Sequence, residues 1–251
     1  MFSLFRRTMS TTSGSRWKEL SKYSACDVAD ALLKLKVPGA GFLVDISPIP
    51  TQSNLTSPLL SKIIAPASTV LMIPKASPSF PTPQKGNKED YVPSNIEPGV
   101  PYADLIPPDS IVLISQPPRQ ACAVMGGIMA ARMKHLGAKA VVVDGRVRDL
   151  ATLAQLSDAV PVWSKGTSII GAGAESKFHA IGVPVQIGEV VVEEGDIVMV
   201  DLVERGVVVV PRGRVEEVLG LLPGLVGADE RVMGDVEAGV SVREAFARHR
   251  S

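Results

Sequence analysis

Two short apolar strands that flank one glycine-bounded helix constrain the fold more than any other feature of this chain. The first strand is Ile111-Val-Leu-Ile-Ser115, the helix covers 128–136 and ends at Gly137, and the second strand is 140–143. Short apolar runs are typical of buried strands, and glycine commonly follows the last residue of a helix. This segment therefore predicts a mixed α/β fold with both strands in the core.

The chain before residue 111 contributes one helix and an irregular strand region. We expect a helix over 17–36 that contains a start signal at Ser24 and stops at Pro38. The run 63–73 predicts a strand pair or a bent strand, because Pro66 interrupts it.

The chain after residue 143 is rich in predicted strands. Gly195-Asp196 is a turn signal between two of them. Helices are expected over 150–156, 214–222 and 228–248, and strands over 161–163, 183–187, 190–192, 197–200 and 206–211.

Residues 76–108 are rich in proline and polar residues, which indicates an insertion or a long surface loop and not a core element. Apolar strand patterns of the same character lie on both sides of it. We therefore expect one domain over 17–251, preceded by a tail over 1–16.

Charge and aromatic content exclude several classes of partner. The chain has 26 basic and 26 acidic residues, and only 4% of its residues are aromatic. It therefore offers neither a global field that attracts nucleic acid or a membrane surface nor a platform for stacking bases. Cys26 and Cys122 are too few for a disulfide framework. These features favour a site for a small molecule or a protein partner.

The first eighteen residues hold Arg6, Arg7, Arg16 and Lys18 and no acidic residue. This composition resembles a mitochondrial transit peptide, with a plain disordered tail as the alternative, so we expect the cytoplasm or the mitochondrial matrix. No long apolar segment follows the basic residues, which argues against secretion. The longest apolar run, 218–228, is too short to span a membrane.

The glycine pair Gly126-Gly127 precedes the helix over 128–136. Backbone N–H groups at a helix N-terminus attract anions, and glycine lets a ligand approach them closely. The amides of Gly126, Gly127, Ile128 and Met129 could therefore bind a carboxylate or a phosphate, although a plain tight turn explains the same residues.

The charged turn Asp144-Gly-Arg-Val-Arg-Asp149 follows the second buried strand. Arg148 could bind a carboxylate through two parallel hydrogen bonds, and Asp149 could hold a divalent cation together with water molecules. The structural alternative is a solvated turn in which Asp149 caps the helix over 150–156. Both interpretations stay open from the residues alone.

Together the two motifs resemble those of the RraA-like family, which includes 4-hydroxy-4-methyl-2-oxoglutarate aldolases that also decarboxylate oxaloacetate. The bacterial aldolases carry Gly-Asp, twenty residues and then Arg-Asp. Here Gly126-Gly127 is followed by residues 128–147 and then Arg148-Asp149. The resemblance covers about residues 20 to 220 and includes Asp27-Val-Ala-Asp-Ala-Leu32, Pro66-Ala-Ser-Thr-Val70, Pro161-Val-Trp-Ser-Lys165, Val183-Pro-Val185 and Gly206-Val-Val-Val-Val-Pro211.

The resemblance assigns roles to these residues. It implies that Asp149 is the protein ligand of Mg²⁺ or Mn²⁺, that Arg148 binds the substrate, and that the amides of 126–129 bind the carboxylate of a 2-keto acid. The family aspartate that orients a metal-bound water is replaced by Gly127 here. An acidic residue from a neighbouring subunit also belongs to the family site, and Asp229 or Glu230 is the candidate.

For the whole protein the resemblance implies a β/β/α sandwich of the swivelling-domain type, assembled as a homotrimer or a hexamer. The expected function is that of a class II, metal-dependent aldolase or oxaloacetate decarboxylase. The alternative is a non-catalytic, protein-binding regulator, since some relatives act in that way. Lys165 could suggest a Schiff-base aldolase, but a lysine at a strand end is more often simply solvated.

Overall fold

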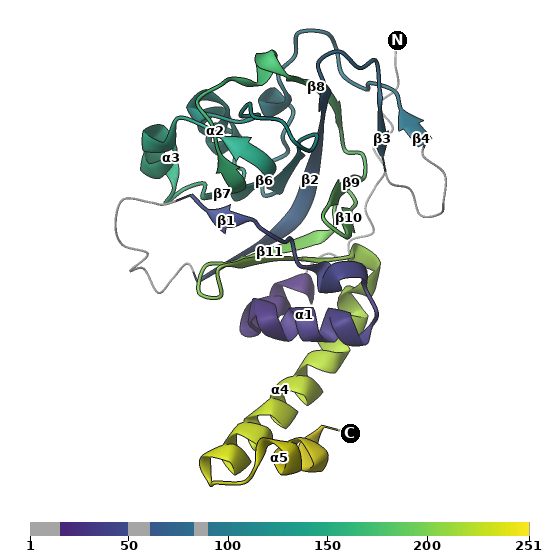
Figure 1. Ribbon diagram of the computed structural model, residues 1–251, viewed down its shortest axis with the longest axis vertical. Coiled ribbons are helices and arrows are strands. Elements are labelled where there is room, and N and C mark those ends of the chain that lie inside the picture. The colour runs from purple at the N-terminus through teal and green to yellow at the C-terminus, as the bar shows by residue number, and fades with distance from the viewer. Residues whose placement is uncertain (1–15, 50–60, 83–89, 251) are drawn as a thin grey trace.

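The computed structural model describes residues 16–49, 61–82 and 90–250, and its framework is one curled sheet of eight strands (Figure 1). Seven strands follow one another across the sheet in the order β1 (Ser47–Pro48), β7 (Val162–Thr167), β6 (Ala140–Val147), β5 (Ile111–Ser115), β2 (Lys62–Pro74), β11 (Ile197–Asp201) and β12 (Gly206–Val210). The eighth strand, β8 (Ser176–Ile181), pairs with the second half of β2.

The centre of the sheet is parallel. Strands β2, β5, β6 and β7 run in the same direction, whereas β1, β8, β11 and β12 pair antiparallel to their neighbours. Helix α2 (Gly127–His135) follows β5, and helix α3 (Leu150–Leu156) follows β6. The turns that lead into both helices therefore lie at the same edge of the sheet, where the parallel strands end.

Three groups of buried side chains hold the layers together. One fills the inside of the curled sheet and includes Trp163, together with the hairpin of β9 (Val185–Ile187) and β10 (Val190–Val192). A second packs α2 and α3 on the other face of the parallel strands. The third joins α1 (Ala25–Lys34) and α4 (Val215–Glu237) to β11 and β12. The expected fold, a mixed α/β sandwich in a single domain, is confirmed.

Strand β2 continues through Pro66, so the expected break is wrong. The N–H of Ala67 donates to Asp196 on the β11 side of β2, at 2.7 Å. Backbone N–H groups alternate between the two sides of a strand, so the nitrogen of Pro66 faces the other side. Pairing with β5 begins only at Ala67. The missing donor of Pro66 therefore costs no sheet hydrogen bond.

Strand β6 extends further than the predicted run 140–143. It continues to Val147 and stays paired with β7 across a bulge between Val143 and Arg146. A bulge re-aims side chains at a strand end, and polar residues can then follow a buried segment without leaving the sheet. Residues 144–147 of the charged turn therefore belong to strand β6.

The sequence patterns missed strands β1 and β8 and the small pair β3 (Phe80–Thr82) and β4 (Asp90–Val92). In β8 the buried positions include Ser176 and His179, which hides the apolar alternation typical of a strand. Part of the proline-rich segment also belongs to the core. A 3₁₀ turn (Tyr102–Asp104) buries Tyr102, and Ile106 is buried as well. The surface-loop interpretation is wrong there, and residues 83–89 lie outside the described residues.

The N-terminal helix is divided in two by its start signal. A 3₁₀ helix (Arg16–Lys22) precedes α1, and Ser24 begins α1 with a capping box shared with Asp27. The buried carboxylate of Asp201 accepts a third hydrogen bond at this helix start, from the N–H of Ala25 at 3.0 Å. The helix is thus attached to the end of β11.

The structure has two C-terminal helices, as predicted, but the boundary between them lies at a different place in the chain. Helix α4 continues through Pro223, and α5 (Val242–His249) folds back along it, away from the sheet (Figure 1). Proline removes the donor for the carbonyl of Leu219, but Pro223 is exposed and water can replace it. Leu222 and Val232 are buried on either side, so packing holds the helix through the proline.

The predicted targeting tail is almost entirely outside the described residues, which begin at Arg16. Within the described ranges, no helix combines the length and apolar character needed to cross a membrane. Cys26 and Cys122 are both free thiols.

Candidate functional site

The structure brings the glycine pair and the charged turn together at the edge where β5 and β6 end. Met125 bridges to Val147, and the N–H of Arg148 donates to the carbonyl of Met125 at 3.0 Å. Gly126 directly precedes α2 at the N-cap position, and Asp149 directly precedes α3 at the same position. Two motifs separated by twenty residues are therefore direct neighbours.

Asp149 connects the two motifs through its side chain. Its Oδ2 atom accepts a hydrogen bond from the N–H of Gly127 at 2.9 Å. Its backbone is in the left-handed region, with φ of 62°, and its side chain makes no capping bond to α3. The structural alternative, in which the side chain of Asp149 caps α3, is thus wrong. The side chain caps α2 instead. The side chain remains 43% exposed and is accessible to a ligand.

Glycine is required at two positions around this carboxylate. A Cβ atom on Gly126 would lie 2.6 Å from Oδ2 of Asp149 and 3.2 Å from Cγ of Arg148. A Cβ atom on Gly171 would lie 2.9 Å from Nη1 of Arg148. Real Cβ atoms essentially never lie less than 3.0 Å from such an atom, so the contacts of 2.6 and 2.9 Å would force a neighbouring side chain to move. The two glycines therefore make the space that Arg148 and Asp149 occupy.

Arg148 and the N-terminus of α2 both contribute positive electrostatic potential at this site. The guanidinium of Arg148 is 44% exposed, and its Nε lies 3.9 Å from Oδ2 of Asp149. The N–H groups of Ile128 and Met129 belong to the first turn of α2, which has no acceptors within the helix. The helix dipole adds partial positive charge at the same end. An anion placed here can receive hydrogen bonds from Arg148 and from these amides.

Gly127 lies against α3. The space beside it is occupied by a side chain that the sequence patterns did not single out. A Cβ atom on Gly127 would lie 2.8 Å from Cγ2 and 2.9 Å from Cβ of Thr152. Thr152 therefore occupies the space that a larger residue at position 127 would need. Position 127, where this chain departs from the Gly-Asp motif, can therefore hold a larger residue only if Thr152 on α3 moves or becomes smaller.

A network of polar side chains holds the loop that leads into α2. Buried Gln116 accepts a hydrogen bond from the N–H of Arg146 and donates to the carbonyl of Cys122, both at 2.8 Å. Glu175 accepts from the N–H groups of Ala121 at 2.7 Å and Cys122 at 2.8 Å. The hydrogen bond from Cys122 is the main reason that the pKa of Glu175 is lowered. In the sequence, Gly145 marks this network, because a Cβ atom added at that position would collide with the side chain of Gln116.

Lys165 forms an ion pair with Asp144, and both lie at the ends of neighbouring strands. Burial raises the pKa of Asp144, and the hydrogen bond from Lys165 opposes that shift. This pairing favours a structural lysine over a Schiff-base nucleophile.

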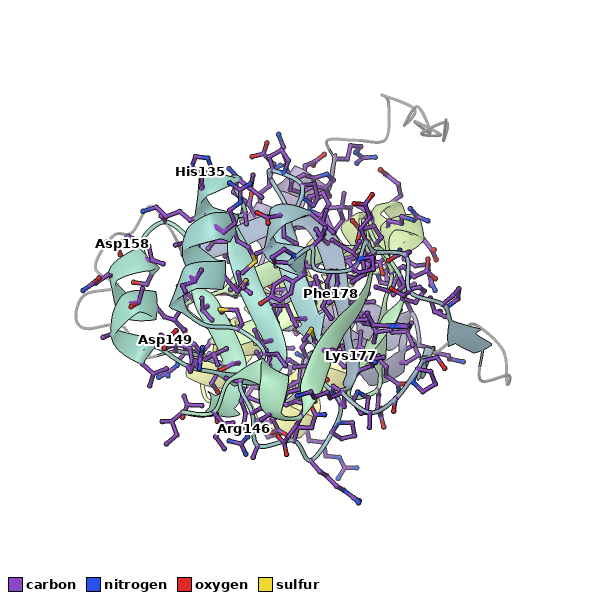
Figure 2. All side chains as sticks on the ribbon, turned by 90° about the horizontal axis from the view of Figure 1, so that it is seen from above. His135, Arg146, Asp149, Asp158, Lys177 and Phe178 are labelled. Carbon is purple, nitrogen blue, oxygen red and sulfur yellow. The ribbon has the colours of Figure 1, made fainter. Side chains whose placement is uncertain are left out.

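The three histidines lie away from the glycine pair. Nε2 of His179 is 2.7 Å from the carbonyl oxygen of Val92, and Nε2 of His249 is 3.1 Å from Oδ2 of Asp235. His135 is at the far end of α2, and Figure 2 shows it across the molecule from Arg146. The described residues contain no group of three or more histidine, cysteine or acidic side chains arranged to hold a metal.

Asp149 fits the requirement of a hard divalent cation that is held by one carboxylate and several waters. Its Oδ2 is engaged by one N–H group, which leaves Oδ1 and half-exposed surroundings for a cation. Mg²⁺ keeps most of its waters and binds proteins through one or two carboxylates together with substrate oxygens. The donor set therefore suits Mg²⁺ or Mn²⁺ and does not suit zinc, which prefers several nitrogen or sulfur ligands.

The two acidic candidates on α4 differ in their surroundings. Asp229 pairs with Arg250, with its Oδ1 atom 2.8 Å from Nε of the arginine, whereas Glu230 is exposed. Of the two, Glu230 is the one free to reach a neighbouring subunit without breaking that ion pair.

Sequence comparison identifies a family and several relatives of this chain. Residues 25–209 match the sequence model of the RraA-like family, described as Aldolase/RraA. Protein DlpA of Legionella pneumophila is 24% identical over 237 residues, which are 94% of this chain and 34% of that protein. A protein of Halalkalibacterium halodurans named "Putative 4-hydroxy-4-methyl-2-oxoglutarate aldolase" is 31% identical over 112 residues, which are 45% of this chain and 51% of that protein. The chain thus spans about a third to a half of these curated relatives.

Solved structures share the fold over nearly the whole chain. A protein from Pseudomonas syringae pv. tomato has a TM-score of 0.66 at 23% identity, covering 91% of this chain and 95% of that one. Streptomyces coelicolor RraAS2, described as an unusual member of the RNase ES inhibitor RraA protein family, has a TM-score of 0.63 at 22% identity, covering 90% and 96%. At these identities the likeness concerns the fold alone.

Proposed function

We propose that this chain, which belongs to the RraA-like family, is a divalent-metal-dependent carbon–carbon lyase acting on short 2-keto acids. The reactions proposed are cleavage of 4-hydroxy-4-methyl-2-oxoglutarate to pyruvate and decarboxylation of oxaloacetate. One observation carries the proposal: a half-exposed carboxylate, an arginine and the N-terminus of α2 meet at one point. The relative from Halalkalibacterium halodurans supports the aldolase branch by its name.

Both reactions break the carbon–carbon bond one carbon away from the keto carbon and leave an electron pair on the pyruvate half. Asp149 would hold the divalent cation, which would supply Lewis acidity when bound. Arg148 and the amides of Ile128 and Met129 bind the carboxylate and orient the keto oxygen. Gly126 and Gly171 leave the room that the Arg148 side chain occupies beside these amides.

The two reactions differ in their need for a base. Aldol cleavage requires removal of a proton from the tertiary hydroxyl, whereas decarboxylation releases carbon dioxide without that step. Gly127 provides no carboxylate for this purpose. We therefore expect oxaloacetate decarboxylation to be favoured over aldol cleavage in this protein.

The direct test is pyruvate release from oxaloacetate by the purified protein, measured above the background of the metal ion alone. Activity should disappear after treatment with EDTA and return when Mg²⁺ or Mn²⁺ is added. Activity that is indifferent to the chelator would contradict the role of Asp149 as a metal ligand. The free energy of unfolding should be measured with and without EDTA, to separate loss of activity from loss of folding.

A paired substitution tests the role of position 127. Gly127→Asp alone should destabilise the protein by about 1–3 kcal/mol, because its Cβ collides with Thr152. In the double variant Gly127→Asp/Thr152→Gly the space is restored. Aldol cleavage should then rise relative to decarboxylation, with Thr152→Gly as the matched control. An unchanged ratio of the two activities in a folded double variant would contradict the model of a missing base.

A non-catalytic regulator is the second candidate, and Gly127 is the observation that favours it. A protein that binds a partner does not need a carboxylate at this position. The description of RraAS2 as a member of an RNase inhibitor family supports this class for a relative. Absence of metal-dependent pyruvate release from both substrates would favour the regulator over the lyase.

Assembly as a homotrimer or a hexamer, with the site at a subunit boundary, is part of the proposal. Ile128 is 80% exposed and Ile169 is 96% exposed, and both follow segments that contribute to the site. Leu150 and Ile170 are further exposed apolar residues in the same segments. Exposed apolar groups of this kind favour contact with another protein surface. Sedimentation equilibrium would give the number of subunits.

A further inference from the structure

We propose that Arg146 selects substrates with a second carboxylate, so that the preferred ligands are dicarboxylic 2-keto acids. The inference rests on the proposed function, since it assigns the far end of the same substrate. Neither the glycine pair nor the Arg-Asp pair includes this residue.

Arg146 is among the last residues of β6, and Arg148 directly follows Val147, where the strand ends. Val147 lies between them and is fully buried in the core beneath α2 and α3. Since successive side chains of a strand point to opposite faces, both arginines face away from that core and toward the same side. Their Cα atoms are separated by about 7 Å, two residues of extended chain. Two arginine side chains therefore leave the chain on the same side, next to the site.

The guanidinium of Arg146 is held in place by the backbone. Its Nη1 donates to the carbonyl of Thr167 at 3.0 Å, and its Nε donates to the carbonyl of Gln120 at 3.4 Å. Gly166 gives it room, because a Cβ there would lie 3.1 Å from Nη1. Arg148 is accommodated against Gly171 in the same way. The guanidinium of Arg146 is thus oriented by the backbone before any ligand binds.

The charge of Arg146 is not neutralised by the protein. Across the described ranges, no carboxylate lies within ion-pair distance of it, whereas Arg132, Arg214, Arg248 and Arg250 are all paired. A guanidinium carries five N–H donors, and the two carbonyl bonds leave most of them available. Figure 2 shows Arg146 low in the view and Asp149 higher and to the left of it. An exposed, unpaired and oriented cation beside the site is suited to a carboxylate.

The spacing fits a substrate with carboxylates at both ends. Arg148 and the amides of α2 bind the carboxylate next to the keto group, and Arg146 is one strand repeat away along the same face. A dicarboxylate offers one carboxylate to each arginine, whereas pyruvate has a single carboxylate to offer. Arg146 should therefore contribute to binding of the substrate and not to the bond-breaking step.

The test compares Arg146→Gln, Arg146→Lys and Arg243→Gln, an exposed control on α5. With Arg146→Gln, KM for oxaloacetate should rise roughly tenfold to a hundredfold, kcat should change less than about twofold, and Arg146→Lys should be intermediate. Inhibition by pyruvate should be unchanged in all three variants, and equal urea midpoints would show that they fold. Protection from heat unfolding by 2-oxoglutarate, but not by pyruvate, should be weakened in Arg146→Gln.

The possible outcomes separate the two proposals. If the wild-type protein is active and Arg146→Gln leaves KM for oxaloacetate unchanged, or weakens pyruvate and oxaloacetate equally, the selection role is overturned and the lyase stands. If the wild-type protein neither releases pyruvate nor binds these acids, both proposals fail together.

Discussion

Replacing Asp149 with asparagine should lower kcat/KM for oxaloacetate about a thousandfold while leaving the fold intact. Asparagine keeps an oxygen that can accept the N–H of Gly127, and it tolerates the left-handed backbone of this residue. It lacks the negative charge that a divalent cation needs from its protein ligand. Loss of several kcal/mol of charge stabilisation corresponds to a rate effect of this size. Steady-state kinetics at saturating Mg²⁺ would measure it.

Asp149→Ala provides the comparison that separates the two roles of the carboxylate. Alanine loses the cap of α2 and is strained in the left-handed region, so it should also destabilise the protein by about 2 kcal/mol. Urea unfolding of both variants would measure this difference. If asparagine retains most of the wild-type activity, the carboxylate is only a helix cap and the metal site is wrong.

The largest expected effect on stability is at Asp201, far from the proposed site. This side chain is fully buried and accepts hydrogen bonds from Ala25, Val203 and Glu204, at 3.0, 3.0 and 3.2 Å. Asp201→Ala should lower the free energy of unfolding by about 3 kcal/mol, because it leaves these N–H donors without their charged acceptor. Urea denaturation monitored by circular dichroism would measure the change.

Asp158→Ala is the control for Asp201, since Asp158 is an exposed aspartate that follows α3. It should change stability by less than about 0.5 kcal/mol. A loss at Asp201 no larger than this would mean that α1 does not depend on its attachment to β11.

Much of the fold could be predicted because local signals and tertiary packing agree. The strand Ile111–Ser115 and the helix Leu150–Leu156 have the predicted bounds, and the capping box at Ser24 is present. The errors occur where a distant partner decides the outcome. Pro66 is tolerated because β5 starts one residue later, and Pro223 is tolerated because packing holds both halves of α4.

The candidate site was predictable in its residue types and spacing but not in its contacts. The glycine pair and the Arg-Asp pair are adjacent in space, as the resemblance implied. Sequence alone could not show that Asp149 caps α2, because that bond joins residues 22 positions apart. Nor could it show that Thr152 fills the space beside Gly127, since nothing in the α3 pattern distinguishes that threonine. The catalytic roles of these residues stay predictions until activity is measured.

The close contacts around the four glycines Gly126, Gly127, Gly145 and Gly171 have a practical consequence for protein engineering. At these positions any larger residue requires a neighbouring side chain to move, so a saturation library should be enriched in destabilised variants. Libraries aimed at new substrates should instead vary the side chains that press on the glycines, such as Thr152 and Gln116. Shortening one of those residues first creates the volume in which a neighbouring position can then be diversified.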